Sequence, residues 1–157
     1  MYINKTGRND LVTMKVAHDP EKIYFYAKTS EKLTNHNDLN WMLLFIDIDQ
    51  SRDTGWQGYD FVVNLDVRDN TTSLTRLKEG SNPDGIAMIS YAESNNELEL
   101  EIPRKALGLR PNHKIGLDFK WADNTQKLYD INEFFVNGDV APERRFNYRY
   151  KEGNYPL

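Results

Sequence analysis

Four aspartates follow the most apolar run of the chain and are its strongest candidates for a metal site. Asp47 and Asp49 come directly after that run, and the turn-rich segment beyond them contains Asp53 and Asp60. Carboxylate oxygens are hard ligands that suit Ca²⁺, which takes about six to eight oxygens. The segment therefore predicts a structural calcium site. A solvated loop with capping aspartates is the alternative interpretation.

The EF-hand template does not describe this segment. Counting from Asp47, the sixth position is Arg52 where an EF-hand has glycine, and the twelfth is Gly58 where it has glutamate. A calcium site here must be of another type. No organic cofactor is expected, because the chain lacks the glycine-rich motifs that bind dinucleotides or phosphates.

Aromatic residues beside expected loops are the second candidate set. Their flat rings stack on the apolar face of a sugar, while nearby Asn, Asp, Arg and Gln side chains bind its hydroxyls. Core packing is the alternative for two of them, which lie in or beside expected strands. Trp56, next to Gly55, is the hardest to assign to a core. The sugar-stacking candidates are Trp41, Trp56, Trp121 and Tyr129.

The residue inventory favours binding over catalysis. Glycoside hydrolysis uses two carboxyl groups about 5 to 9.5 Å apart, but the 24 acids would supply such a pair by chance. The absence of cysteine excludes thiolate zinc sites, disulfides and cysteine nucleophiles. His18, His36 and His113 lie in expected turns or loops without metal-ligand spacing. We therefore predict a noncatalytic protein.

The elements that must position these residues are predicted to be strands. Alternating or continuous apolar runs recur every 8 to 15 residues without long amphipathic helices between them. The run 41–47 is typical of a central strand covered on both faces, and 74–77 of a short edge strand. One helical turn is expected at 103–108, with weak helical spacing at 128–135. The expected strands are 11–17, 23–29, 41–47, 59–65, 74–77, 86–92, 97–102, 115–121 and 146–150.

This pattern predicts an all-β fold: an antiparallel two-sheet β-sandwich, jelly-roll or immunoglobulin-like, with one or two short helical turns. Residues 1–157 are expected to form a single module. Asparagine and aspartate supply 30 of the 157 residues, which indicates many Asn/Asp turns between the strands.

Composition also limits the partners. The net charge of -4 argues against nucleic acid as a partner, because phosphate binding needs concentrated Lys and Arg. No apolar run approaches the ~18 residues of a membrane span. No signal peptide is visible at Met1–Lys5. The abrupt opening close to a strand indicates a module cut from a longer parent chain.

Several short motifs occur along the chain: Lys15–Asp19, Ile23–Tyr26, Leu44–Asp47, Gly55–Phe61, Leu98–Pro103 and Phe119–Asp123. Together they resemble motifs of the family 9 carbohydrate-binding modules and the wider DOMON-like β-sandwich group. The resemblance covers roughly residues 11–124 and implies a two-sheet sandwich with structural calcium and tryptophans that clamp a terminal sugar. Trp41 is the nearest match to the first clamp residue, and Trp121 or Tyr129 to the second.

The resemblance implies a noncatalytic carbohydrate-binding module attached to a larger glycan-active or surface protein. That parent protein would be secreted, periplasmic or at the cell surface, and the partners would be carbohydrate and the rest of the parent chain. A structural or interaction domain that has lost sugar binding is the first alternative. A catalytic domain associated with glycoside hydrolases is the second.

Overall fold

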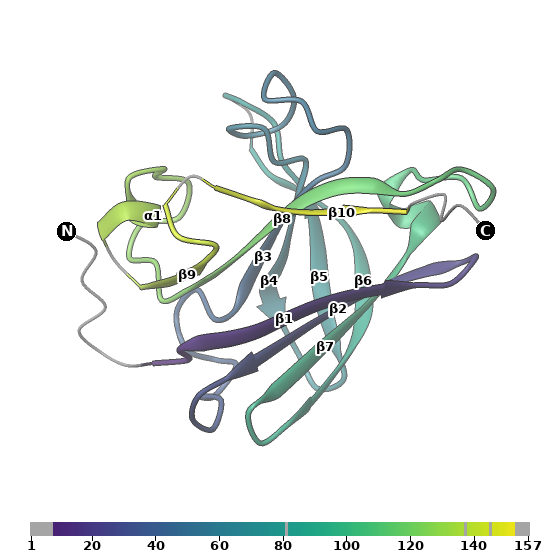
Figure 1. Ribbon diagram of the computed structural model, residues 1–157. Helices are drawn as coiled ribbons and strands as arrows, with labels where there is room; N and C mark the ends of the chain where they lie inside the picture. The colour runs from purple at the N-terminus through teal and green to yellow at the C-terminus, as the bar shows by residue number, and fades with distance from the viewer. Residues whose placement is uncertain (1–7, 81, 137, 145, 153–157) are drawn as a thin grey trace.

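The computed structural model describes residues 8–80, 82–136, 138–144 and 146–152. Strands dominate the described chain, and the helical segments are short (Figure 1). The strands are β1 (Leu11–His18), β2 (Lys22–Thr29), β3 (Leu43–Asp47), β4 (Phe61–Val67), β5 (Thr71–Arg76), β6 (Asp84–Ser94), β7 (Glu97–Pro103), β8 (Gly116–Asp123), β9 (Asp139–Ala141) and β10 (Tyr148–Lys151). The helical segments are the 3₁₀ turn η1 (Arg104–Leu107) and α1 (Glu133–Val136).

The described strands form one antiparallel sheet in the order β1-β2-β7-β6-β5-β4-β3-β8-β10, and β9 also pairs with β8. The prediction of an all-β antiparallel fold is confirmed. Hydrogen bonding links the strands into one continuous sheet that rolls around a shared interior (Figure 1), whereas the sequence predicts two sheets. The edge strands β1 and β10 lie close together at one point. The ring centroids of His18 in β1 and Tyr150 in β10 are 5.7 Å apart.

The apolar pattern explains which side of each strand is buried. In β7, glutamates alternate with Leu98, Leu100 and Ile102, all three of which are fully buried. All residues of β3 are buried, which confirms the prediction of a central strand covered on both faces. Leu44 and Ile46 point into the main core. Phe45 belongs to a second cluster on the other face of the strand.

The second cluster places a separate apolar layer over the β3, β4 and β8 part of the sheet. Phe134 of α1 and Val140 of β9 pack there against Phe45 and Val62. Lys120 of β8 is fully buried beside this layer: its Nζ donates to the Pro142 carbonyl and lies 5.3 Å from the Phe134 ring centroid. The C-terminal part of the chain therefore covers a face of the sheet that carries part of the candidate site.

Asparagine performs the turn role that composition predicts. Non-glycine residues with positive φ include six asparagines, at positions 9, 40, 64, 70, 95 and 124. Asparagine tolerates this left-handed conformation better than most residues because its short side chain hydrogen-bonds locally. Asn95, for example, has φ of 55° in the tight turn between β6 and β7.

One expectation about the elements is wrong, and one strand was not expected. Residues 74–76 of the expected strand 74–77 belong to β5, which lies between β4 and β6 and is no edge strand. Thr72 and Ser73 are buried there, and Thr72 Oγ1 donates to Asn64 Oδ1 at 2.8 Å. Because these buried residues are polar, the apolar pattern of the sequence underestimates both the length of β5 and the extent of its burial. The three-residue β9 has no predicted counterpart.

Candidate functional site

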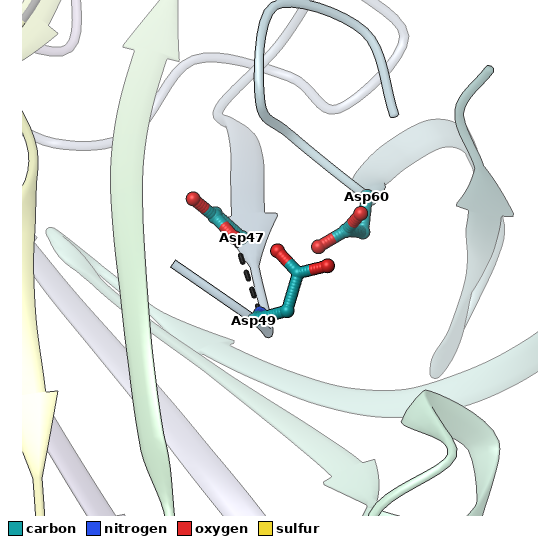
Figure 2. A group of neighbouring side chains, drawn as sticks. All are labelled: Asp47, Asp49 and Asp60. Atoms are coloured by element: carbon teal, nitrogen blue, oxygen red, sulfur yellow. Dashed lines mark hydrogen bonds between the residues drawn. The ribbon is translucent and has the colours of Figure 1, made fainter. Parts of the chain in front are cut away.

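The loop between β3 and β4 brings three of the four candidate calcium ligands together. Asp47 is the last residue of β3, Asp49 lies in the loop, and Asp60 precedes β4. Carboxylate oxygens of these residues lie within 4.8 Å of one another (Figure 2). Oxygens bound to one Ca²⁺ at about 2.4 Å are at most about 4.8 Å apart, so the spacing fits a shared cation. Asp53 is outside this group and is exposed.

Backbone hydrogen bonds fix the orientation of the three carboxylates. The Asp49 N–H donates to Asp47 Oδ1 at 3.2 Å, and the Ile48 N–H donates to Asp60 Oδ2 at 2.9 Å. The Ser51 N–H donates to Asp49 Oδ1 at 2.9 Å. Capping bonds of this kind also occur in loops that bind no metal. The aspartates therefore also fit the alternative interpretation, a loop with capping aspartates.

Burial disfavours the charged form of two of the three carboxylates, whereas Asp49 is exposed and hydrogen bonds lower its pKa. Asp47 is only 4% exposed, and burial, followed by the hydrogen bond with Asp49, raises its pKa to about 7. Burial also raises the pKa of Asp60. Neighbouring carboxylates repel one another when all are ionised, and a bound cation would remove that repulsion.

A tight turn presents Trp56 on the same loop. The backbones of Trp56 and Tyr59 exchange two hydrogen bonds, of 2.8 and 2.9 Å, around a two-residue turn. Gln57 and Gly58 both have positive φ there, as a type I′ turn requires. At Gly55, with φ of 65°, an added Cβ would lie 1.9 Å from the Tyr59 carbonyl oxygen. The sequence Gly-Trp-Gln-Gly thus fixes the position of the indole.

Neighbouring rings then hold the Trp56 side chain in place. Its ring centroid lies 5.8 Å from that of Phe45, 6.2 Å from those of Tyr59 and Phe134, and 5.6 Å from that of Tyr129. The Trp56–Tyr129 contact is edge-on, with 70° between the ring planes. Both residues remain partly exposed. Of the four aromatic candidates, these are the two that the structure brings together beside solvent.

Trp56 and Tyr129 line a cavity of about 340 Å³ together with the chain that follows β5. Leu77, Lys78 and Glu79 contribute to its wall. Figure 1 shows the β3–β4 loop and the β5–β6 connection protruding from the same end of the sheet. The cavity combines aromatic and apolar surface with a few polar groups, the mixture typical of small-ligand sites.

The hydroxyl group of Tyr129 has no hydrogen-bond partner among the described residues. Its Oη is buried and makes no hydrogen bond in the described chain, and burial raises the pKa of the phenol. Its backbone also has a positive φ of 64°, which is unusual for a bulky residue. A buried donor without a partner carries a desolvation cost that a ligand acceptor could relieve.

The prediction that Trp41 and Trp121 stack on a sugar is wrong for this arrangement. Trp41 is 1% exposed and Trp121 is 0% exposed, and both belong to the main core. The Trp41 Nε1–H donates to the Thr34 carbonyl at 3.0 Å. Their ring faces are covered by protein, so the core-packing alternative holds for both residues.

Sequence reasoning missed the cavity residues that follow β5. Leu77, Lys78 and Glu79 carry no motif, and only the pairing of β5 with β4 places them beside the Trp56 turn. Phe45 and Phe134, which support Trp56, were expected only as apolar pattern residues.

Among the described residues, no helix has the length and apolar character that crossing a membrane requires. Comparison of the chain with protein-family models, with curated proteins and with solved structures finds no match.

Proposed function

We propose that this chain is a noncatalytic carbohydrate-binding module that holds a sugar in the cavity beside Trp56 and Tyr129. The observation that carries the proposal is the partly exposed Trp56 ring, fixed by a glycine-bounded turn and four neighbouring rings. A ring that is already ordered loses little conformational entropy when a ligand stacks on it. Lys78 and Glu79 line the same cavity and supply hydrogen bonds for hydroxyls.

The acid content of the cavity favours binding over hydrolysis. Glu79 is the one carboxylate among the described residues that line it. Glycosidases generally need two carboxyl groups, one as the acid and one as the base or nucleophile. A single acid suits hydrogen bonding to hydroxyls, which needs no partner carboxylate.

A structural calcium ion at Asp47, Asp49 and Asp60 is the second part of the proposal. The close approach of the three carboxylates and the hard oxygen donor set support it. The ion would neutralise the cluster and fix the β3–β4 loop, which also carries Trp56. Its role would therefore be to order the loop that presents the stacking residue.

The parent protein proposed from the sequence is a larger exported glycan-active or surface protein of which this chain is one module. The resemblance to family 9 carbohydrate-binding modules supports this proposal through short motifs. A structural or interaction domain is the competing function. The observation that favours it is the burial of Trp41 and Trp121, which removes the two-tryptophan clamp that the family resemblance implies.

A glycan-binding screen on the full chain tests the proposal, with Trp56→Ala as the site variant. We expect at least one glycan to bind and Trp56→Ala to weaken it by about thirtyfold, equivalent to about 2 kcal/mol for a central aromatic contact. Phe146→Ala is the matched control, because Phe146 is 71% exposed and lies outside the cavity. Binding that both variants retain, or no binding to any glycan, would contradict the proposal.

A further inference from the structure

A second cavity lies next to the proposed sugar site. It has a volume of about 370 Å³, and Leu77 and Lys78 line both cavities, so the two cavities adjoin at this dipeptide. Ile48, Phe61 and Leu107 supply apolar surface to the second cavity. A glycan longer than one sugar ring, bound beside Trp56, would extend into this neighbouring space.

Two cations without ionic partners line the second cavity. The side chains of Arg76 and Lys78 are exposed, and neither makes a hydrogen bond or ion pair within the described chain. The Arg76 guanidinium lies 5.6 Å from the centroid of the Phe61 ring, a cation–π contact that holds it over the cavity. Asp84 is opposite Arg76 in β6, and the described residues show no ion pair between the two side chains.

The two carboxylates that line these cavities, Asp60 and Glu79, already accept backbone hydrogen bonds. Asp60 lines the second cavity, but its carboxylate accepts the Ile48 N–H and belongs to the aspartate cluster. Glu79 lines the first cavity and accepts a long hydrogen bond of 3.5 Å from the Gln57 N–H. An anionic group on a ligand would therefore lie against the Arg76 and Lys78 side of the second cavity.

From this geometry we infer that the bound glycan is acidic, with a uronic acid carboxylate beside Arg76 and Lys78 and a neighbouring sugar ring on Trp56. The inference rests on the glycan-binding function proposed above and adds its substrate class. Arginine suits this role because its planar guanidinium matches a carboxylate with two parallel hydrogen bonds. Lys78, between the two cavities, would contact the same carboxylate or a hydroxyl of the adjacent ring.

Calorimetric titration of the full chain with tetragalacturonate and with its full methyl ester tests the inference, because the two ligands differ mainly in charge. We expect the acid to bind about tenfold more tightly at low ionic strength, the gain of one charged hydrogen-bonded contact. The double variant Arg76→Gln with Lys78→Gln should remove that preference. Lys32→Gln with Lys151→Gln, which removes two exposed cations outside both cavities, should keep it.

Each result has a defined consequence. If the ester binds as well as the acid and Trp56→Ala abolishes both, the acidic class is wrong while glycan binding stands. If a preference for the acid survives in the Arg76 and Lys78 double variant, the assigned site is wrong. If a sulfated galactan binds more tightly than the uronate, the carboxylate assignment is wrong. If a glycan screen finds no ligand at all, the proposed function and this inference both fail.

Lys78→Gln alone, at an exposed position, keeps the test valid if the double variant unfolds.

Discussion

Tyr129 is the residue at which ligand contact can be separated from packing. Its ring packs against Trp56, while its hydroxyl is buried and makes no hydrogen bond to the described residues. Removing the oxygen leaves the ring contact intact and removes a desolvated polar group. The ring and the hydroxyl therefore have opposite expected effects on the stability of the protein without ligand.

Tyr129→Phe should leave the melting temperature unchanged or slightly higher, because no hydrogen bond within the described chain is lost. The same variant should bind the glycan about five- to tenfold more weakly if the hydroxyl donates to a sugar oxygen. Thermal melting and calorimetric titration measure the two effects. A clear drop in melting temperature would mean that the hydroxyl has a structural partner, and unchanged affinity would remove it from the site.

Lys120 is the residue at which burial and charge conflict most directly. It is fully buried, and burial lowers its pKa to about 7. Below pH 7 the lysine is protonated in both states. Between pH 7 and about 10.5 the folded lysine is neutral while the unfolded lysine keeps its proton. The unfolded state then binds more protons, so this group makes stability rise with pH across that window.

We compare the free energy of unfolding of the wild type with that of Lys120→Met. As the pH rises from 7 to 9, the wild-type value should increase relative to the variant's value by about 2 kcal/mol. Urea denaturation of both proteins at several pH values measures this difference, and other titrating groups cancel in the comparison. The exposed Lys32→Met is the control and should show no such trend. A difference that is constant with pH would mean that Lys120 stays protonated in the folded protein.

At the scale of elements, the Trp56–Tyr59 turn positions the stacking residue, and glycine permits it. Gly55 has both a positive φ and a carbonyl oxygen where a Cβ would lie. Gly85 of β6 has neither a positive φ nor any atom within 4 Å of an added Cβ. The two glycines therefore form a matched pair for testing how far the turn determines the site.

Gly55→Ala should destabilise the protein by about 2 to 4 kcal/mol and weaken glycan binding, because the turn must distort and move Trp56. Gly85→Ala should change either quantity little. Urea denaturation gives the stabilities and titration with the glycan gives the affinities. Equal effects of the two substitutions would show that the Trp56 turn does not depend on Gly55.

The β3–β4 loop should respond to calcium. A cation in hundredfold excess over its dissociation constant stabilises the native state by about 2.7 kcal/mol, or roughly 5 to 10 °C in melting temperature for a chain of this length. We expect a chelator to lower the melting temperature of the wild type by that amount. Asp49→Asn should lose the response, whereas Asp53→Asn should keep it, because Asp53 is outside the carboxylate group. An identical melting curve with and without chelator would exclude a structural calcium ion there.

The elements could be predicted where one physical pattern dominated. Strict alternation in β7 and the continuous apolar run in β3 indicated their burial correctly. In β5 the apolar pattern does not predict the burial of Thr72. This side chain is polar and is buried because its hydroxyl donates a hydrogen bond to Asn64, and a hydrophobic pattern cannot reveal such a contact. Trp41 was misassigned for a related reason, since its position beside β3 did not distinguish a loop ring from a core ring.

The candidate site could be predicted only in part, because it depends on contacts between distant segments. Trp56 and the aspartates are neighbours in sequence, so the sequence alone predicts that they share one loop. The resemblance and a place beside loops point to Tyr129, but its contact with Trp56 requires the C-terminal segment to fold over the sheet. Leu77 and Lys78 join the site through strand pairing, which leaves no local motif.

At the scale of the whole molecule, the rolled sheet divides the aromatic residues into two populations. Trp41 and Trp121 fill the interior, whereas Trp56 and Tyr129 lie in the outer layer beside solvent. The β3–β4 loop and the β5–β6 connection meet at one end of the sheet (Figure 1). This division makes Trp56 the natural reporter of a ligand among the three tryptophans.

The most direct test is a titration of the ¹⁵N-labelled chain with the glycan found by the screen, following the indole N–H signals. Three such signals are expected, one for each tryptophan. If the sugar stacks on Trp56, that signal should shift in a saturable manner while those of Trp41 and Trp121 stay nearly fixed. Saturable binding that leaves the Trp56 signal unmoved, or that shifts the buried tryptophans instead, would contradict a sugar site at this ring.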